Sequence, residues 1–561
     1  MHTDYFIRKF DFMYSRIRSS ILLYLVLISF TSHAQFSFTD SNLPIVKIYT
    51  GGSTIIDAVK KTCDMQIIWD ESGERNYITD LPNNYNGKIG IEIRGSTSQQ
   101  YPKKSYGLET RDSTGLRLNV SLLGMPEEND WILYGAYPDK TLMRNEITFH
   151  LFSRMQAWSP RFVYCELLID DEYMGVYSLL EKVKNDKHRV DIANLDSNDI
   201  AGDSLTGGYI IKIDKLTGSS LTTWTSPYQY KLQYLYHDPE DIEMTIEQLL
   251  FIKNYVTDFE DAVYGVGFTD PVFGYRGYID VNSFIDFFLM QELGRTVDGY
   301  RSSSFMYKDK GEKLCAGPMW DFNLSYGNAD YCAAYDTTGW QYNFAEICDY
   351  FTTEPPEWWP RLLEDSSYTR QMKCRWEELR TGILNTDSIN AWIDSVALLL
   401  DESQTRNFMQ WDILGEYVNW NYFVGDTYEE EIDYLKWWFK ARLSWMDENL
   451  PGTCPDLVAD TTYHDGFDPV ETTINELQPI YTTVYPNPFS STATFAYDSR
   501  DQSAKQLIIS DLLGLEVARY VVPAGKQSVI IESAGLANGI YIYQFRDGLV
   551  KLGSGRIVIS R

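Results

Sequence analysis

Two carboxylates, Asp298 and Asp321, bound the stretch of the chain whose residue types are best suited to chemistry. Between them, residues 302–308 and 313–319 are apolar-rich runs separated by the turn-forming sequence Asp-Lys-Gly-Glu, which predicts a β-hairpin. A hairpin returns the chain to the end from which it started, so we expect the two carboxylates to lie close together. The alternative is structural: Asp298 caps a turn, and Asp321 follows a core tryptophan.

A helix is expected to deliver the first carboxylate. Residues 281–293 carry apolar side chains at helical spacing, with Asp280 or Asn282 available as the cap. Helix, acidic loop, hairpin and second acidic loop is the order in which protein kinases build their phosphoryl-transfer centre. In that centre one Asp orients the substrate hydroxyl and the other holds magnesium on the nucleotide phosphates. Carboxylates suit this chemistry because magnesium prefers hard oxygen ligands.

A second candidate feature is a strand–loop–strand unit further upstream. Residues 88–93 alternate apolar and polar side chains, the polar loop 94–98 follows, and residues 105–109 predict the next strand. Such a loop can lay backbone N–H groups and hydroxyls over phosphates, with Lys103 or Lys104 adding positive charge. The loop has a single glycine, so an exposed hairpin with solvated lysines is the alternative on spacing alone.

Several blocks of sequence together resemble one known family. The stretch VDGYRSSSFMYKD…GPMWDFNLSYGNADYC is similar to the active-site segment of the CotH (spore-coat protein H) kinase family, which are atypical protein kinases. The blocks RGSTSQQYPKKSYGLE, DKTLMRNE, GVYSLLEKVKNDKHRVDI and GGYIIKIDK match as well and follow the family's order. The resemblance implies an α+β fold with a two-lobed, kinase-like domain. It also implies an atypical protein kinase that uses ATP and Mg²⁺ (or Mn²⁺) to phosphorylate Ser or Thr of a protein substrate.

The same resemblance implies roles for individual residues. Asp298 is expected to act on the substrate hydroxyl, and Asp321, with Asn323 two positions later, to bind the metal. Three further residues are expected at the nucleotide: Arg94 and Lys104 on the phosphates, and Glu181 near the adenine, in the segment that joins the two lobes.

Two positions depart from the family pattern. Many members have Asn five residues after the first Asp, where this chain has Ser303, and many have a carboxylate at the position of Asn323. Fewer anionic ligands predict weaker metal affinity, because hard divalent cations are bound more tightly by charged oxygens. The alternative function is therefore a catalytically weak or inactive surface binding protein, an adhesin on a kinase-derived fold. ATP is scarce outside the cell, and some fungal members of the family act as ligands for host receptors.

Length and charge limit the remaining possibilities. A chain of 561 residues predicts two or three domains. Its formal net charge of −30 argues against a nucleic-acid partner, because such a partner requires a basic face. Residues 1–34 place basic residues before a short apolar run and end in Ser-His-Ala, which predicts a signal peptide and an exported protein; a short N-terminal membrane anchor is the alternative. No other stretch is long and apolar enough for a transmembrane helix.

The chain is expected to divide into a kinase-like domain at 35–455, a linker at 456–480 and a small all-β sandwich at 481–561. The last part has short alternating runs separated by Gly, Asn and Asp turns. Its opening YPNPF, its LANGIYIYQF and its final GSGRIVISR resemble the type A C-terminal sorting domain of the type IX secretion system of Bacteroidetes. The resemblance implies the type IX machinery as a partner, and a protein that is secreted or held at the outer-membrane surface. A carbohydrate-binding β-sandwich is the alternative.

The remaining predictions concern cysteines and helices. Seven cysteines without a CxxC pair make a zinc site unexpected, and export permits disulfides. Cys332 and Cys348 bracket an aromatic loop and are the best pair, and the odd count leaves at least one free thiol. Helices are predicted at 139–155, capped by Asp139, and at 368–380, 388–400 and 428–449, with their tryptophans in the core: Trp392, Trp437, Trp438 and Trp445.

Overall fold

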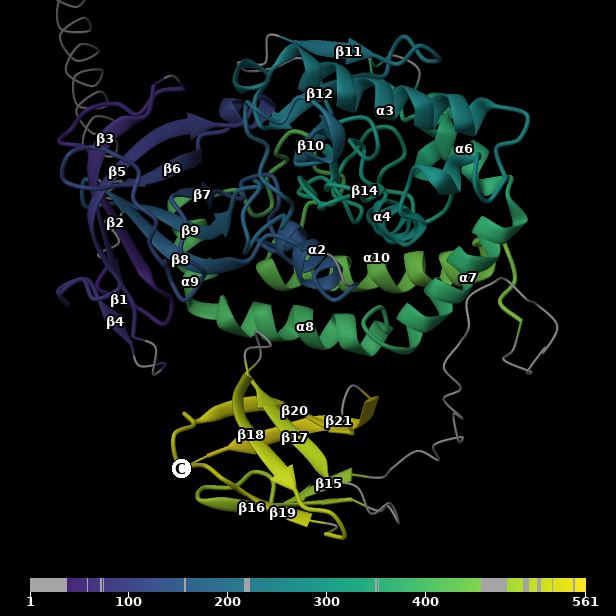
Figure 1. Ribbon diagram of the computed structural model, residues 1–561. Helices are drawn as coiled ribbons and strands as arrows, with labels where there is room; N and C mark the ends of the chain where they lie inside the picture. Colours follow the sequence, from purple (N-terminus) through teal and green to yellow (C-terminus); the bar gives the residue numbers. More distant parts are fainter. Residues whose placement is uncertain are drawn as a thin grey trace, which may run out of the picture.

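The computed structural model describes two long parts of the chain. These are residues 38–455 and 482–560, apart from short gaps at 58, 71–72, 74, 156–157, 216–221, 349–350, 352, 498–503, 512–515, 527 and 548–549. The predicted signal peptide and the predicted linker lie outside the described residues. Within them the architecture is mixed α+β, as predicted, and the C-terminal region is all-β (Figure 1).

Strands in the first part of the chain close into a barrel around its own apolar core. In barrel order they are β2 (Ile45–Tyr49), β3 (Lys61–Ile68), β5 (Tyr85–Arg94), β6 (Ser105–Arg111), β7 (Asp130–Tyr134), β9 (Glu172–Glu181) and β8 (Phe162–Ile169). The pairing of β2 with β8 is parallel and the others are antiparallel. The alternation predicted for β5 is confirmed, since Ile89 and Ile91 are fully buried in the barrel core. A short pair, β1 (Asp40–Ser41) with β4 (Asn76–Tyr77), lies outside the barrel.

A second, five-stranded sheet carries the residues around the two carboxylates. Its order is β11 (Thr223–Thr225), β12 (Gln233–Asp238), β10 (Tyr209–Ile213), β13 (Ser304–Lys308) and β14 (Leu314–Ala316). Strands β13 and β14 form the predicted hairpin, although the paired residues are fewer than the apolar runs indicated. The sheet therefore begins one strand a few residues after Asp298 and ends another a few residues before Asp321.

Helices pack together with this sheet in the largest core cluster (Figure 1). They are α3 (Ile246–Tyr264), α4 (Val281–Gly294), α6 (Trp358–Leu363), α7 (Ser366–Thr381), α8 (Thr386–Leu399), α9 (Asp401–Gln410) and α10 (Tyr428–Asn449). The short helix α5 (Phe344–Ile347) is not part of this cluster. Helix α4 confirms the prediction, because Asp280 accepts a hydrogen bond from the Ser283 N–H and caps it. Trp438 and Trp392 are buried as expected, but Trp437 is 57% exposed, so its assignment to the core was wrong. Among the described residues no helix has the length and apolar character needed to cross a membrane.

The helix predicted at 139–155 is shorter than its sequence pattern. Helix α2 spans Arg144–Phe152, because Leu142 has a left-handed backbone (φ 60°) that no α-helix accommodates. Asp139 still binds the first turn: its Oδ2 accepts from the Arg144 N–H at 2.8 Å, and its Oδ1 pairs with the Arg144 guanidinium at 2.6 Å. Glu146 is completely buried and accepts a hydrogen bond from Ser178, and burial raises its pKa to about 8.

The C-terminal region forms two antiparallel sheets that share one core, which fits the predicted sandwich. One sheet has the order β15 (Thr482–Tyr485), β16 (Thr492–Tyr497) and β19 (Ser528–Glu532). The other has the order β18 (Glu516–Val522), β17 (Lys505–Ser510), β20 (Gly539–Asp547) and β21 (Val550–Ile559). Phe495 and Phe545, one from each sheet, lie with ring centroids 5.0 Å apart in the shared core.

Two disulfides link parts of the helical region. Cys332–Cys348 is the predicted pair, and Cys374–Cys454, which the sequence pattern did not indicate, joins α7 to the segment after α10. The thiols of Cys63, Cys165 and Cys315 are free, which agrees with the expected odd thiol.

Candidate functional site

A cavity of about 680 Å³ lies between the barrel and the second sheet. Barrel residues at the ends of β5, β7 and β9 line it on one side, and residues of β10, β12 and β13 line it on the other. The start of α2 and the two loops that hold Asp298 and Asp321 complete the lining. The carboxylates that the sequence predicted to meet therefore face one cavity.

Asp298 reaches the cavity through the turn that follows α4. The helix ends at Gly294, and Arg295 takes a left-handed conformation (φ 43°) that turns the chain. The Asp298 backbone carbonyl accepts hydrogen bonds from the N–H groups of Arg301 (3.3 Å) and Ser302 (2.9 Å), which closes a compact turn. Its side chain is 32% exposed, and Oδ1 accepts from the Arg301 guanidinium at 2.8 Å.

Asp321 lies in the loop that follows the hairpin. Its backbone is left-handed (φ 66°), and the next N–H, that of Phe322, donates to Asn145 Oδ1 of α2 at 2.6 Å. Burial raises the pKa of Asp321 to about 6, with further contributions from the negative charges of Asp298 and Asp214. Arg94 and Lys215 act in the opposite direction. Carboxylates and cations from separate segments thus meet at Asp321.

The cations form a second group in the same cavity. Arg94 is the last residue of β5, and its guanidinium carbon lies 5.5 Å from the Trp320 ring centroid. Burial lowers the pKa of Arg94 and also that of Lys182, which follows β9. Neither side chain has a hydrogen-bonding partner in the part of the chain that the structure describes. Lys212 and Lys215, at the end of β10, complete the group: Lys212 pairs with Asp214 at 3.1 Å.

The loop after Arg94 is held in place from within. Gly95 has φ +99°, and a Cβ there would lie 2.1 Å from Ser98 Oγ, so only glycine fits this turn. Residues 97–100 form the short 3₁₀ helix η1 (Thr97–Gln100). Lys104 Nζ donates to the carbonyls of Gln99 and Tyr101, each at 2.6 Å, and does not line the cavity. The structure thus places Lys104 behind the loop and Arg94 inside the cavity.

Glu181 lies at the end of β9, but its side chain points away from the cavity. Its carboxylate accepts two hydrogen bonds from the Arg161 guanidinium, at 2.7 and 3.0 Å, and Arg189 lies 3.8 Å away. The neighbours on either side, Leu180 and Lys182, do line the cavity, as expected from the alternation of a strand. The segment expected near the adenine is therefore at the cavity, while the Glu181 side chain has a structural environment.

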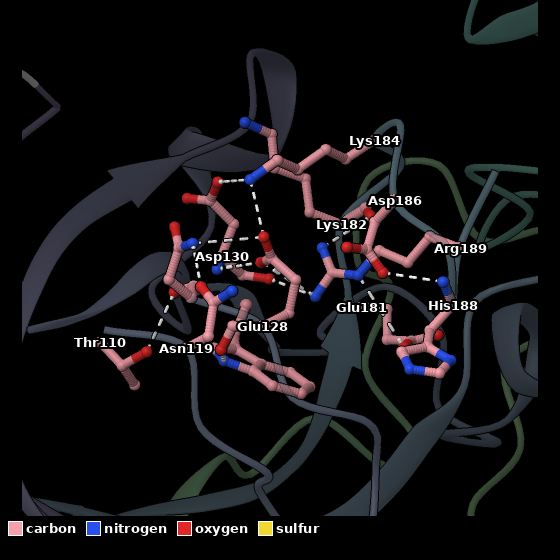
Figure 2. A network of polar contacts seen from close by, with 12 residues as sticks. Thr110, Asn119, Glu128, Asp130, Glu181, Lys182, Lys184, Asp186, His188 and Arg189 are labelled. Carbon is pink, nitrogen blue, oxygen red and sulfur yellow. Dashed lines mark hydrogen bonds and ion pairs between the residues drawn. The ribbon is translucent and has the colours of Figure 1, made fainter. Parts of the chain in front are cut away.

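A network of ion pairs fixes the segment that follows β9 (Figure 2). Lys184 bridges Glu128 at 2.7 Å and Asp130 at 3.0 Å, both next to β7. Arg189 donates to the carbonyl of Lys182 at 3.0 Å and to that of Asp130 at 2.7 Å. The barrel thus positions the backbone of Lys182 while leaving its ammonium group at the cavity.

His237 on β12 also lines the cavity but acts as a structural tie. Burial lowers its pKa to about 3, so the ring is neutral, and its Nε2–H donates to the Val183 carbonyl at 3.0 Å. This bond joins the second sheet to the segment after β9.

Oxygen donors for a cation are present but few. Asn323 and Ser303 both line the cavity together with Asp321. The described residues contain no group of three or more His, Cys, Asp or Glu side chains placed to hold a metal on their own. Mg²⁺ is commonly bound through one or two carboxylates plus substrate phosphates, so the donor set of Asp321 and Asn323 fits a metal that arrives with a nucleotide.

Sequence reasoning did not single out several of the cavity residues. They are Lys182, Lys212, Asp214 and Lys215. A signal was present, because Lys182 lies in the block GVYSLLEKVKNDKHRVDI and the other three lie in GGYIIKIDK. Each block was recognised as a whole, without assigning chemistry to its charged residues.

Comparison with known families gives two matches. Residues 91–446 match the model described as CotH kinase protein, and residues 483–560 match the secretion system C-terminal sorting domain. No curated protein matches the chain. The first match includes Asp298, Asp321 and the other cavity residues from Arg94 to Trp420, and the second covers the all-β region, which is a type IX sorting domain. The chain therefore belongs to the CotH kinase protein family and carries a C-terminal sorting domain that directs secretion or attachment to the cell surface.

Proposed function

We propose that the protein is an exported atypical protein kinase that transfers the γ-phosphate of ATP to a Ser or Thr hydroxyl of a protein substrate. In this proposal the barrel and the helical region correspond to the two lobes of a kinase, and the cavity between them binds the nucleotide. Membership of the CotH kinase family supports the reaction class.

One observation carries the proposal. The carboxylate of Asp321 interacts electrostatically with Asp298 and Asp214, and also with Arg94 and Lys215. These residues come from the loop after α4, the end of β10 and the end of β5. Crowding of carboxylates and cations around the poorly solvated Asp321 costs free energy unless a ligand of mixed charge uses it. A nucleotide with a divalent cation has this character, since anionic phosphates and the cation occur in one molecule.

The acidic residues have distinct roles in this proposal. Asp321 and Asn323 would hold the cation through their oxygens, with Ser303 lining the same cavity. Asp298 would accept the proton of the substrate hydroxyl. One of its oxygens is held by Arg301, and Oδ2 has no hydrogen bond to the described residues, so it is available to a substrate. When bound, the magnesium nucleotide supplies the phosphoryl group and a counter-charge for the carboxylates.

The basic residues orient and neutralise phosphates. The Arg94 guanidinium lies over the Trp320 ring and has no hydrogen-bonding partner among the described residues. Lys182 lines the cavity on the same side, and Lys215 contacts the loop at Thr97 Oγ1 (3.5 Å). Charge-assisted hydrogen bonds from such groups are about twice as strong as neutral ones. Lys104 contributes indirectly, by holding the loop through its carbonyls.

Export completes the proposal. We infer a signal peptide at 1–34, a kinase-like domain at 35–455, a linker at 456–480 and the sorting domain at 481–561. The sorting-domain match supports delivery by type IX secretion to the medium or the outer-membrane surface. An acceptor protein outside the cytoplasm follows from this location.

Two substitutions test the assignment of roles in the full chain. Asp321→Ala is expected to abolish metal-dependent ATP binding, whereas Asp298→Ala keeps binding and loses transfer. The measurements are a thermal shift with ATP and Mg²⁺ or Mn²⁺, and incorporation of labelled phosphate into protein. Asp394→Ala is a matched control, since this carboxylate is 62% exposed and pairs with Lys436 on the surface. Equal loss of ATP binding in both active-site variants contradicts the assigned roles.

The alternative function has its own readout in the same experiment. If the wild-type chain shows no thermal shift with ATP and either metal, the kinase proposal fails. The surface binding protein on a kinase-derived fold is then favoured, in line with Ser303 and Asn323 at positions where many relatives carry stronger metal ligands.

A further inference from the structure

Arg301 is buried beside the proposed catalytic carboxylate. Its side chain is 3% exposed, and Nη2 donates to Asp298 Oδ1 at 2.8 Å. Nε donates to the Val297 carbonyl at 2.8 Å, so the guanidinium bonds two consecutive residues at the start of the turn. Because the guanidinium is planar, these bonds set the direction of the Asp298 carboxylate.

Two aromatic rings hold the other side of the guanidinium. The Arg301 Cζ lies 4.4 Å from the ring centroid of Phe344 and 4.2 Å from that of Phe351. Nη1 donates to Thr353 Oγ1 at 2.9 Å. Arg301 therefore joins Asp298 to a separate segment of chain, none of whose described residues lines the cavity.

This segment is closed by a disulfide. Phe344 begins α5. The residue that caps the C-terminus of this helix, Cys348, donates its N–H to the Phe344 carbonyl and is disulfide-bonded to Cys332. Earlier in the segment, the N–H groups of Gln341 and Tyr342 are anchored on the buried Glu292 carboxylate, at 2.7 and 2.9 Å. After it, Glu354 pairs with Lys231. In sequence, Cys348 lies between these anchors and between the two rings, and its disulfide ties this stretch back to Cys332.

We propose that Arg301 is a positioning residue for Asp298 and that the Cys332–Cys348 disulfide completes its clamp, so that phosphoryl transfer requires oxidation of this cysteine pair. The inference rests on the proposed function. Formation of the bond releases two protons and two electrons from the two thiols, and a disulfide donor of the exporting compartment takes them up and becomes a dithiol. Cytoplasmic thiols are kept reduced, whereas compartments outside the cytoplasm permit disulfides. The protein would therefore gain activity only after export.

The test uses three variants of the full chain: Arg301→Gln, Arg301→Lys and the double substitution Cys332→Ser with Cys348→Ser. The matched control is Cys374→Ser with Cys454→Ser, which removes the other disulfide. For each, kcat and the KM for ATP are measured, together with hydrogen–deuterium exchange of the backbone at 297–303. We expect kcat to fall on the order of 10²-fold in Arg301→Gln and in the Cys332/Cys348 variant, the cost typical of a misplaced catalytic group.

The split between the kinetic constants separates positioning from a general structural role. The KM for ATP should change by less than about threefold, because Arg301 contacts Asp298 and not the cation-lined side of the cavity. Exchange at 297–303 should rise in both variants. Arg301→Lys should recover part of kcat, since lysine keeps the charge but makes a single contact in place of the fork. The control variant should keep its kcat even where its melting temperature falls.

Each failure has a distinct meaning. Wild-type kcat in Arg301→Gln overturns the positioning role, and wild-type kcat in the Cys332/Cys348 variant overturns the oxidation requirement, whatever its exchange. If the wild-type chain transfers no phosphate, the proposed function fails. Hydrogen–deuterium exchange at 297–303 then tests by itself whether Arg301 and the disulfide hold the Asp298 turn in place. Unchanged exchange at 297–303 in both variants then contradicts it, and increased exchange supports it.

Discussion

The carboxylate of Asp298 lies close enough to Asp321 to oppose the ionisation of Asp321. Burial is the larger cause, and the two effects, with Asp214, raise the pKa of Asp321 to about 6. Two neighbouring carboxylates thus oppose the ionised form of Asp321, while Arg94 and Lys215 favour it. The free energy of unfolding measured without nucleotide should therefore depend on whether Asp321 is ionised.

The first prediction concerns stability against pH. The pKa of Asp321 is raised above its ordinary 3.8, so between about pH 4 and pH 6 the folded protein holds a proton that the unfolded chain releases. The free energy of unfolding therefore falls as pH rises through this window. Asp321→Asn removes the titration and should stabilise the metal-free protein by about 1–3 kcal/mol at pH 7, with little difference at pH 4. Chemical denaturation with a chelator present measures this.

The control for this prediction is Asp64→Asn, because Asp64 is 55% exposed and pairs with Lys88 on the barrel surface. Its pH profile should follow that of the wild type. If Asp321→Asn is no more stable than the wild type at pH 7, the folded protein does not destabilise the ionised form of Asp321, and the prediction is wrong.

The second prediction places a carboxylate at position 323, where the family resemblance leads us to expect one. Asn323→Asp should tighten binding of ATP with Mg²⁺ or Mn²⁺, because a carboxylate binds a hard cation more strongly than an amide does. Another negative charge beside Asp321 should also lower the melting temperature of the metal-free protein. Affinity titrated with and without each metal is the measurement. Unchanged affinity with both metals would place Asn323 outside the metal site and strengthen the binding-protein alternative.

The third prediction distinguishes two cations that the sequence could not tell apart. Arg94→Met should weaken ATP binding by about 10- to 100-fold, since a hydrogen bond to a charged group is worth about 1.5–3 kcal/mol. Lys104→Met should weaken it less, because among the described residues its ammonium donates to the loop carbonyls of Gln99 and Tyr101 and does not line the cavity. Its effect should be visible without nucleotide, as faster hydrogen exchange at 95–101. Equal losses of affinity, with no change in that loop, would assign both residues to the phosphates.

The fourth prediction concerns the sorting domain. Among the described residues, the buried members of its core all come from 489–559, and none comes from residues 38–455. Deletion of 481–561 should therefore leave the melting temperature of the remainder nearly unchanged while the protein accumulates in the periplasm. Cell fractionation and thermal denaturation measure the two effects. Unchanged export of the shortened chain would contradict the role of the tail.

Local patterns predicted the elements that hold the carboxylates. The apolar spacing before Gly294 and the cap at Asp280 define α4, and the turn residues after Lys308 define the hairpin. These signals lie within a few residues of each other, so no distant contact was required to read them. The meeting of Asp298 and Asp321 followed from the same local geometry.

The direction of side chains was not predictable in this way. Lys104 turns back to carbonyls three and five residues before it, which depends on the fold of the loop and not on its composition. Glu181 turns toward Arg161, which lies 20 residues away on the neighbouring chain segment. The late start of α2 has a similar cause. Asp139 binds the N–H of Arg144 across a left-handed Leu142, a geometry that apolar periodicity does not record.

The bond between Cys374 and Cys454 has a mechanical consequence for a chain that is exported by its C-terminal end. Cys454 is followed in sequence by the segment that leads to the sorting domain, so any pull on that segment first meets a covalent crosslink. Force on the segment is then transmitted to α7 as well as α10, so α10 cannot unfold alone from its C-terminal turn. Traction or cutting beyond Cys454 should therefore leave the helical region closed at its end.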